Sequence, residues 1–476
     1  MTGPLQALLA PAAVAVVGAS DNIHKVGGRP LQYLAQQGFR GRVYPVNPRA
    51  ATVQGLRAYP SLEALPEVPD AVVVCIASEG VEEQLVACGR LGVKAVVLFA
   101  SGYAETGSAG RERQQHLQRI CQRAGVRLLG PNSIGVASFD SGAVLSFASI
   151  YADCAPQDGP VAIVSQSGAF GVSLYALLRE RGVGVRCVAA TGNEADLDTA
   201  DFIAALAQRP GVHLVLLYLE NVRDPERMRA ALVLARECGV QVVAVRAGAS
   251  EHGRRSAGLH TGAQGAGMPA LDALFDGAGC RSVADLDALL RCVPGYLQRA
   301  QAAMRVRLPA KPRLAVVSNS GAYCVLAADQ ASRVGLPLAR LSDASCARMG
   351  ALLPAFSLNR NPLDLTAALL GQPGLLGDVV ACALADPAVD TVVLGLLAMG
   401  GPSYDIARFA RDCRAAVEAE GKSLWLFSPH AHVRSGFAQQ GFPVFRGEAE
   451  AVAEIAGFAL HLAGRATPLP ADAVRA

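Results

Sequence analysis

The sequence predicts an α/β protein in which helices cover both faces of parallel β-sheets. Two observations lead to this fold class. Short apolar runs rich in Val, Ile and Leu alternate with amphipathic helical stretches through nearly the whole chain. In addition, the segment at residues 161–185 recurs at residues 314–338, so part of the chain is duplicated. With 476 residues, the chain has room for about three domains of ordinary size.

The first domain is predicted over residues 1–150 and is Rossmann-like. Its strand candidates are residues 13–18, 42–47, 71–77, 94–100 and 126–130. Amphipathic helical stretches separate these runs, which brings the loops after the strands to one edge of a parallel sheet, where open α/β sheets bind ligands. The first loop, VVGAS, lacks the GxGxxG pattern, which argues against a nicotinamide-dependent reductase. The nearby cations Lys25, Arg29 and Arg49 suit either phosphate groups or a solvated surface.

The repeat sets the organisation of the remaining chain. Its offset is constant at 153 residues, from Ser165 to Ser318 and from Gly182 to Gly335. Each copy shows a strand pattern, an SxSGA turn and a helix pattern, as in flavodoxin-like domains. We therefore predict two such domains, the second a degenerate duplicate of the first. They cover residues 160–295 and 312–465, and a tail follows at residues 466–476.

Both SxSGA turns are candidate anion sites. In each turn, glycine lets the backbone bend sharply and the helix start exposes N–H groups. Ordinary N-capping by serine is the alternative for a single turn. Recurrence in two related domains favours a phosphate held from two sides. The candidate residues are Ser165, Gln166, Ser167, Gly168, Ser318, Asn319, Ser320 and Gly321.

Two further residues are candidates for catalysis. His260 lies in the glycine-dense segment GRRSAGLHTGAQGAG, a setting that suits a residue approached closely by a substrate. Glu220 ends an apolar strand candidate, so its carboxylate would point into the ligand crevice and could orient an imidazole. A helix cap or a surface ion pair is the alternative for Glu220. The third domain has Ala398 at the equivalent position and no matching histidine loop.

Composition excludes several classes of partner. The net charge is only +3, which argues against nucleic acid. The twelve cysteines form no CxxC pair, which fits a reducing, cytoplasmic location and disfavours a zinc ribbon. No apolar run approaches the roughly 18 residues of a membrane span. The HAH at residues 430–432 lacks a third ligand at useful spacing, so we expect no metal site.

As an ordered set, the motifs resemble the ADP-forming acyl-CoA synthetases, relatives of succinyl-CoA synthetase, and in particular their alpha-type subunits. Each motif is modest alone, but together they cover nearly the whole chain in the family's domain order. The matching motifs are VAVVGAS, RVYPVNP, SGYAE, LLGPN, VSQSGAF, TGNEADLD, LYLE, LHTG, SNSGAY and NPLDLT.

The resemblance implies a role for specific residues. His260 matches the family's phosphorylated histidine, Glu220 the acid that pairs with it, and Asn193 a residue beside the phosphate that both SxSGA turns hold. The first domain is implied to bind coenzyme A. The implied CoA residues are Gly18, Ala19, Ser20, Lys25, Asn47, Pro48, Ile76, Ala77, Ser78, Ser101, Gly102, Tyr103, Ala104, Glu105 and Asn132.

The implied reaction is acid + ATP + CoA ⇌ acyl-CoA + ADP + phosphate, through an acyl phosphate and a phosphohistidine. No ATP-grasp module follows residue 476 in this sequence. We therefore expect an ATP-grasp beta-type partner subunit in a hetero-oligomer, with ATP, ADP and Mg bound only through that partner, and a small carboxylic acid or acyl-CoA as substrate. Leu259 stands where many members have serine, which bears on substrate preference. A non-catalytic CoA or acyl-CoA sensor is the alternative.

Overall fold

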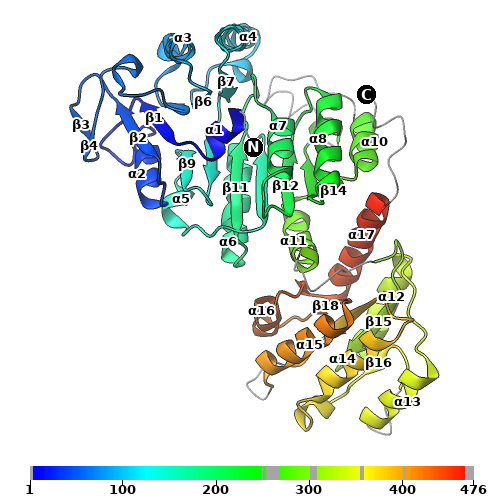
Figure 1. Cartoon of the computed structure of the whole chain (residues 1–476). Helices are drawn as coiled ribbons and strands as arrows, with labels where there is room; N and C mark the ends of the chain where they lie inside the picture. Colours follow the sequence, from blue (N-terminus) through cyan, green and yellow to red (C-terminus); the bar gives the residue numbers. More distant parts are fainter. Residues whose placement is uncertain are drawn as a thin grey trace. The chain divides into compact units, whose positions relative to one another are not determined.

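The structure is a computed structural model that describes residues 4–248, 250–253, 268–300, 308–353, 359–399 and 404–466. The chain forms two compact units, residues 1–290 and 291–476 (Figure 1). Two large sheets lie in the first unit and one in the second. The predicted α/β class with parallel-sheet domains is confirmed.

The first sheet has the strand order β2-β1-β5-β6-β7 and is parallel throughout. Its strands match the predicted runs, and β1, β5 and β6 are short, Val-rich segments that are buried at every position. They are β1 (Ala13–Val17), β2 (Arg42–Val46), β5 (Ala71–Val74), β6 (Ala95–Leu98) and β7 (Arg127–Leu129). The surrounding elements are α1 (Pro4–Leu9), α2 (Arg29–Gln36), α3 (Val81–Leu91), α4 (Ser108–Ala124) and a small hairpin of β3 (Thr52–Val53) and β4 (Leu56–Arg57).

The second sheet has the order β14-β13-β12-β10-β11-β8-β9. Its parallel strands are β10 (Val161–Ser165), β11 (Val185–Ala190), β12 (Leu214–Leu219), β13 (Gln241–Arg246) and β14 (Arg281–Val283). Its helices are α5 (Ile150–Asp153), α6 (Gly168–Glu180), α7 (Thr199–Ala207), α8 (Pro225–Glu237), α10 (Met268–Ala278) and α11 (Leu286–Ala300). The chain passes from β11 across β10 to β12, so a ligand crevice is expected where β10 and β12 end.

One segment departs from the sequence prediction. Residues 135–146, assigned to the first domain, form β8 (Gly135–Ser138) and β9 (Ala143–Ser146). These strands join the second sheet, because β8 pairs antiparallel with β11 and β9 pairs antiparallel with β8. β11 pairs with β10 on one side, and the addition of β8 gives the backbone groups on its other side a neighbouring strand.

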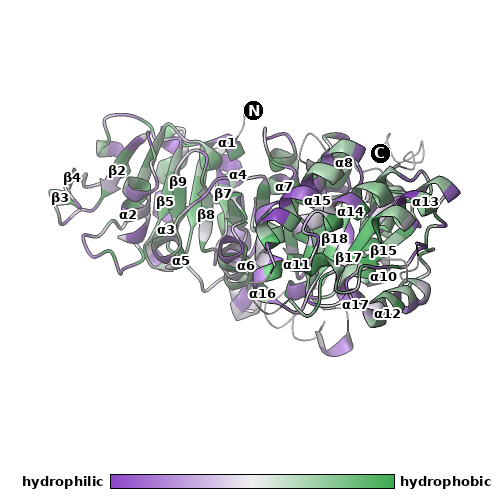
Figure 2. Ribbon diagram, turned by 90° about the horizontal axis from the view of Figure 1, so that it is seen from below, coloured by the Kyte–Doolittle hydropathy of each residue, from purple (hydrophilic) through white to green (hydrophobic). Residues whose placement is uncertain are grey.

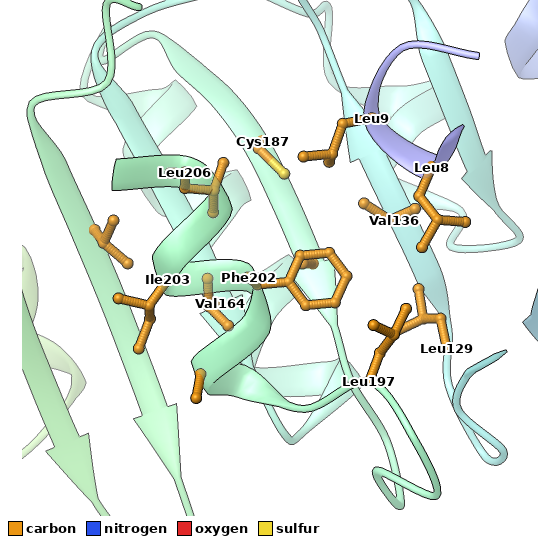
Figure 3. Packing of buried hydrophobic residues seen from close by; sticks show 14 of the residues in the cluster. Leu8, Leu9, Leu129, Val136, Val164, Cys187, Leu197, Phe202, Ile203 and Leu206 are labelled. Atoms are coloured by element: carbon orange, nitrogen blue, oxygen red, sulfur yellow. The ribbon is translucent and has the colours of Figure 1, made fainter. Parts of the chain in front are cut away.

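One hydrophobic cluster of buried residues connects the two sheets of the first unit. The cluster takes Leu129 from β7, Val136 from β8 and Val164 from β10, all buried. Figure 3 shows the Phe202 ring of α7 pointing toward Leu129 and Leu197 beside them. Because this cluster serves both sheets, residues 1–290 form one compact unit.

The second unit repeats the parallel part of the second sheet. Its order, β16-β15-β17-β18-β19, places the first strand between the second and the third, as in β11-β10-β12. The strands are β15 (Leu314–Ser318), β16 (Leu363–Asp364), β17 (Thr391–Gly395), β18 (Ser423–Phe427) and β19 (Val444–Phe445). The helices are α12 (Gly321–Arg333), α13 (Asp343–Leu352), α14 (Leu375–Ala385), α15 (Ile406–Glu420), α16 (Ala431–Gln439) and α17 (Glu448–Ala466). Both bounds of β15 and α12 lie 153 residues after those of β10 and α6, which confirms the predicted duplication.

Hydropathy follows this layered arrangement. Figure 2 shows hydrophobic residues along the strands of the sheets. Strands such as β5, β6 and β10 are buried at every position, as expected for parallel sheets covered on both faces. Among the helices of the described ranges, none is long and apolar enough to cross a membrane.

Candidate functional site

The residues that the sequence assigned to CoA lie together at the carboxyl edge of the first sheet. They are Gly18, Ala19 and Ser20 after β1, Asn47 and Pro48 after β2, Ile76, Ala77 and Ser78 after β5, Ser101 to Glu105 after β6, and Asn132 after β7. Parallel strands bring these five loops to one edge, which is the ligand-binding edge of open α/β sheets. Lys25 is exposed near this edge. Arg29 donates to the carbonyl oxygen of Phe147 at 2.7 Å, which gives it a structural role.

The loop after β1 is tightly packed against its neighbours. Gly18 has φ +82°, and a Cβ there would lie 2.8 Å from the carbonyl oxygen of Cys75. Its N–H donates to the carbonyl oxygen of Val46 at 3.1 Å. The side-chain amide of Asn47 donates to the carbonyl oxygen of Ala19 at 2.8 Å. The glycine therefore lets the ends of β1, β2 and β5 approach closely enough to form one continuous ligand edge.

Asn193, which follows β11, joins the loops of both sheets. Its side-chain amide donates to the Glu105 carboxylate and, at 3.0 Å, to Oε1 of Gln114. Its Oδ1 accepts from Nδ2 of Asn132 at 3.2 Å. The structure thus brings together residues that the sequence assigned to different ligands: Glu105 and Asn132 to CoA, and Asn193 to phosphate. Gln114, on the polar face of α4, was not predicted.

Glu105 is held as a carboxylate at this junction. Besides the bond from Asn193, it accepts from the N–H groups of Gly102 at 2.5 Å and Tyr103 at 3.2 Å. Burial raises the pKa of Glu105, but these hydrogen bonds outweigh it and leave the pKa below its ordinary value. The negative charge is therefore kept at neutral pH, and it fixes the loop after β6 against the second sheet.

Gln166 connects the ends of β10 and β12. Its Oε1 accepts from the N–H groups of Glu220 at 2.6 Å and Asn221 at 3.0 Å. Its Nε2 donates to Oε2 of Glu194 at 2.9 Å and to the carbonyl oxygen of Asn221 at 2.8 Å. A carboxamide has two donors and two acceptor positions. All four are occupied, so this side chain has none left for the phosphate that the sequence assigned to it.

The second unit repeats this connection. Asn319 stands 153 residues after Gln166, and its Nδ2 donates to the carbonyl oxygen of Leu397 at 2.6 Å. Its Oδ1 accepts from the N–H of Leu397 at 2.8 Å. The amide therefore ties the end of β15 to the chain that follows β17. In both copies, the residue between the two serines of the turn connects strands.

The first SxSGA turn leaves backbone N–H groups and the Ser167 hydroxyl proton for an anion. The Ser165 hydroxyl donates to the carbonyl oxygen of Ser167 at 2.6 Å. Ser167 caps α6, since its Oγ accepts from the N–H of Phe170 at 3.3 Å. A Cβ on Gly168 would lie 2.8 Å from Cγ2 of Ile134, which explains the glycine. The capping alternative thus accounts for Ser167, while the helix start retains its N–H groups for an anion.

The second turn differs in charge. The Ser318 Oγ accepts from the N–H of Ser320 at 3.1 Å. A Cβ on Gly321 would lie 2.8 Å from Oδ2 of Asp364, so this carboxylate lies against the first residue of α12. An anion at this helix start would meet a like charge. The two turns, which the sequence treats as equivalent, are therefore electrostatically different.

Glu220 lies where the sequence placed it, directly after β12. Its Oε1 accepts from the Tyr218 hydroxyl at 3.2 Å. The Tyr218 ring stacks on Phe170 with ring centres 4.2 Å apart. Burial, and after it the charge of Glu220, raises the pKa of Tyr218 to about 12, so the phenol remains a donor at neutral pH. The carboxylate is thus held at the end of β12 by a backbone bond to Gln166 and by Tyr218.

Glu194 is a buried carboxyl that the sequence analysis did not single out. It is 3% exposed, has φ +55° and accepts from the Thr191 hydroxyl, the Thr199 N–H and Gln166 Nε2, each at 2.9 Å. Burial, and after it the charge of Asp198, raises its pKa to about 7. The signal available in the sequence was an acidic residue in the loop after a strand.

A cavity of about 250 Å³ opens beside these residues. It lies in the first unit, between the loop after β6, the helix α4 and the loops after β10, β11 and β12. Nine of its twelve lining residues have polar or charged side chains. The lining residues are Ala104, Arg111, Gln114, Gln115, Gln118, Gln166, Gly192, Asn193, Glu194, Ala195, Asn221 and Arg223.

His260 lies outside the described residues, and so does Leu259. Of the HAH pair, His430 accepts at Nε2 from the N–H of Met399 at 3.2 Å. Within the described ranges, no cluster of three or more His, Cys, Asp or Glu residues is arranged to hold a metal ion.

Two family models match the chain in order along the sequence. A CoA binding domain matches residues 12–138, and a succinyl-CoA ligase-like flavodoxin domain matches residues 158–295. These ranges contain the carboxyl edges of the first and second sheets. The cavity lies where the two matched ranges meet.

Similar proteins share these domains. The alpha subunit of an ADP-forming acetate–CoA ligase II of Pyrococcus furiosus is 31% identical over 386 residues, which are 80% of each chain. An ADP-forming acetate–CoA ligase I of Archaeoglobus fulgidus is 32% identical over 362 residues, but the match spans only 50% of that relative. An acetyl-coenzyme A synthetase 1 of Ca. Korarchaeum cryptofilum, solved with phosphate and ADP, has a TM-score of 0.86 at 25% identity over 97% of each chain.

The sequence identity, the coverage and the matched domains agree with the arrangement of the site. The chain therefore belongs to the family of ADP-forming acyl-CoA synthetases, acid–thiol ligases related to succinyl-CoA ligase.

Proposed function

We propose that this chain is the CoA-binding, phosphoryl-carrying component of an acyl-CoA synthetase that catalyses acid + ATP + CoA ⇌ acyl-CoA + ADP + phosphate. The observation that supports this most strongly is the junction around Asn193. There, the CoA edge of the first sheet and the phosphate edge of the second sheet share hydrogen bonds beside one cavity. An acyl group has to meet both CoA and phosphate, and this is the place where both would reach it.

Within this proposal, each residue has a chemical task. The carboxyl-edge loops from Gly18 to Asn132 bind CoA. The thiol sulfur of CoA attacks the acyl carbon of an acyl phosphate, and the bond from carbon to the phosphate oxygen breaks. In the other direction, the phosphoryl group of the acyl phosphate passes to His260. The start of α6 supplies backbone N–H groups to the phosphate, which needs preorganised donors more than covalent help.

Glu220 would orient the His260 imidazole. A carboxylate that accepts one imidazole N–H leaves the other ring nitrogen free as the nucleophile. Gln166 and Tyr218 hold Glu220 in place and are positioning residues in this account.

We further propose that an ATP-grasp partner chain binds the nucleotide and Mg and accepts the phosphoryl group from His260. Support comes from the relatives. One similar protein is named as an alpha subunit, which implies a second chain, whereas another relative is about twice as long as the matched region. Acetate is the acid named for both.

The phosphohistidine can be tested without the partner. Acetyl-CoA and radiolabelled phosphate would form acetyl phosphate and CoA on the chain, and transfer to His260 would release acetate and leave an acid-labile, base-stable label. His260→Ala should abolish the label, whereas the neighbouring exposed His252→Ala should keep it. Equal labelling of His260→Ala would disprove the assignment. CoA binding without label from any acyl-CoA would favour a non-catalytic CoA sensor instead.

A further inference from the structure

Glu194 is a buried titratable residue to which the proposed mechanism gives no task. Its side chain is only 3% exposed, and its φ of +55° is uncommon for a residue other than glycine. It nevertheless lines the cavity beside Asn193, and its carboxyl group is hydrogen-bonded to a residue of the first SxSGA turn. A buried carboxyl group that borders a ligand site is a candidate for a role in the reaction.

The hydrogen bonds of Glu194 connect it to the ends of β10, β11 and β12. Thr191, which follows β11, donates its hydroxyl proton to Oε1 at 2.9 Å. Gln166, which follows β10, donates from Nε2 to Oε2 at 2.9 Å, and its Oε1 accepts from the N–H of Glu220 after β12. One side chain therefore separates the carboxyl group of Glu194 from the backbone of the acid that is proposed to orient the imidazole.

Thr191 can satisfy Glu194 in both of its protonation states. Its Oγ1 lies 2.9 Å from Oε1 of Glu194 and 3.4 Å from the carbonyl oxygen of Ser165. When Glu194 is charged, the threonine hydroxyl donates to it. When Glu194 is protonated at Oε1, it donates to Oγ1 of Thr191, and the threonine proton then turns to Ser165. The N–H of Thr199 and Nε2 of Gln166 keep their acceptors in both states.

The charge of Glu194 matters because a phosphate at the first SxSGA turn would lie nearby. Ser165 and Gln166 belong to this turn, and α6 begins at Gly168 with N–H groups that suit an anion. A charged Glu194 and a phosphate held there would repel each other across Gln166, and burial reduces the screening of that repulsion. Burial, and after it the charge of Asp198, raises the pKa of Glu194 to about 7, so both protonation states are accessible at neutral pH.

The donors to the Glu194 carboxyl group are an amide side chain, a hydroxyl and a backbone N–H, all uncharged. The nearby carboxylates of α7 are instead paired with an arginine of α8, at 3.1 Å and 2.6 Å. A proton is therefore the direct means of removing a repulsion between Glu194 and a bound anion. The charged residues on the neighbouring elements are Asp198 and Asp201 of α7, Arg227 of α8, Glu220 and Arg223 after β12, Glu105 after β6 and Arg111 of α4.

We propose that Glu194 is a positioning residue that takes up a proton when phosphate binds at the start of α6 and releases it when the phosphate leaves. This rests on the proposed function. The proton comes from water or buffer through the cavity that Glu194 lines, an O–H bond forms at Oε1, and no other bond of the protein changes. Gln166 stays hydrogen-bonded to Oε2 in both states, so Glu220 remains fixed while the negative charge of Glu194 is removed.

Isothermal titration calorimetry of the purified chain with inorganic phosphate, in two buffers of different ionisation enthalpy at about pH 7.5, tests this. Wild type should take up about half a proton more than Glu194→Gln, because the proton exchange of phosphate itself cancels in the difference. Relative to this variant, the phosphate affinity of wild type should fall about tenfold from about pH 6 to about pH 9, as expected if bound phosphate raises the pKa of Glu194 by about one. Glu180→Gln removes an exposed carboxylate at the other end of α6 and should behave as wild type.

The outcomes separate this inference from the proposed function. Equal proton uptake by wild type and Glu194→Gln, with phosphate bound by both, would overturn the inference. If Glu194→Gln binds no phosphate, infrared difference spectra of the wild type with isotope-labelled glutamate replace the comparison. A band of a protonated glutamate carboxyl group has to appear on phosphate addition, and its absence overturns the inference as well. A wild-type chain that binds no phosphate would instead count against the proposed function.

Discussion

Burial of Glu194 makes a quantitative prediction about stability. The pKa of this carboxyl is about 7, against an ordinary value of 4.5. Between these two pH values the folded chain keeps a proton that the unfolded chain has released. The free energy of unfolding therefore falls as pH rises through this window. Since each pKa unit is worth about 1.4 kcal/mol, the loss amounts to about 3 kcal/mol.

Glu194→Gln removes the titrating group and keeps its shape. Its amide nitrogen would oppose Nε2 of Gln166, so the variant carries a destabilisation of its own that does not depend on pH. Relative to wild type, the variant should gain about 3 kcal/mol in free energy of unfolding between about pH 4.5 and about pH 8. Urea unfolding at several pH values, followed by far-ultraviolet circular dichroism, measures this difference.

The chain provides an internal control for this experiment. Its single tryptophan, Trp425, is fully buried in the second unit, far along the sequence from Glu194. The tryptophan fluorescence transition should therefore be the same in both proteins. If the difference in free energy of unfolding between the two proteins is independent of pH, the burial of Glu194 does not raise its pKa and the reasoning is wrong.

Three further predictions follow from the hydrogen bonds of the site. Gln166→Leu leaves the N–H groups of Glu220 and Asn221 without an acceptor. It should lower the free energy of unfolding of the first unit by about 2–5 kcal/mol, measured by circular dichroism. An unchanged unfolding transition would contradict the role of Gln166. Asp364→Asn removes a like charge beside the start of α12 and should tighten phosphate binding by at least about tenfold in an NMR titration, and equal affinity would show that Asp364 does not affect the turn. Asn193→Ala should lower phosphoryl labelling from acetyl-CoA more than about tenfold and change CoA affinity less than about threefold. The reason is that Asn193 connects the loops of the first and second sheets through Asn132 and Glu105 and is not itself one of the proposed CoA residues. An equal loss of labelling and of CoA affinity would contradict this role.

The strands could be predicted well because the signal was local. Three strands of the first sheet, β1, β5 and β6, are short runs of buried Val, Ala and Leu, and the duplicated turn appears at a constant offset. Residues 135–146 were not predicted as strands of the second sheet because strand partners are not encoded locally. GVAS and AVLS are weak strand patterns, and the pairing of GVAS with β11 depends on a strand more than forty residues along the chain.

The site could be predicted only in part. Glu220 could be proposed because it ends an apolar strand candidate, whereas Asn132 was named through the family resemblance; both follow the carboxyl ends of strands. Gln166 was named only as part of its turn, and the four hydrogen bonds of its carboxamide could not be foreseen because they depend on the loops after β11 and β12. Gln114 and Arg111 were missed because polar residues on an amphipathic helix usually face solvent.

The shared core of the first unit restricts how catalysis could work. A hinge between the first and second sheets would have to expose Leu129, Val136 and Phe202, each buried, and such burial is worth about 1.5–3 kcal/mol per side chain. Opening and closing of these two sheets is therefore too costly to accompany each turnover. The distance between the carboxyl edge of the first sheet and the α6 turn is therefore constant. Any movement that the proposed transfer of a phosphoryl group requires has to come from another part of the chain.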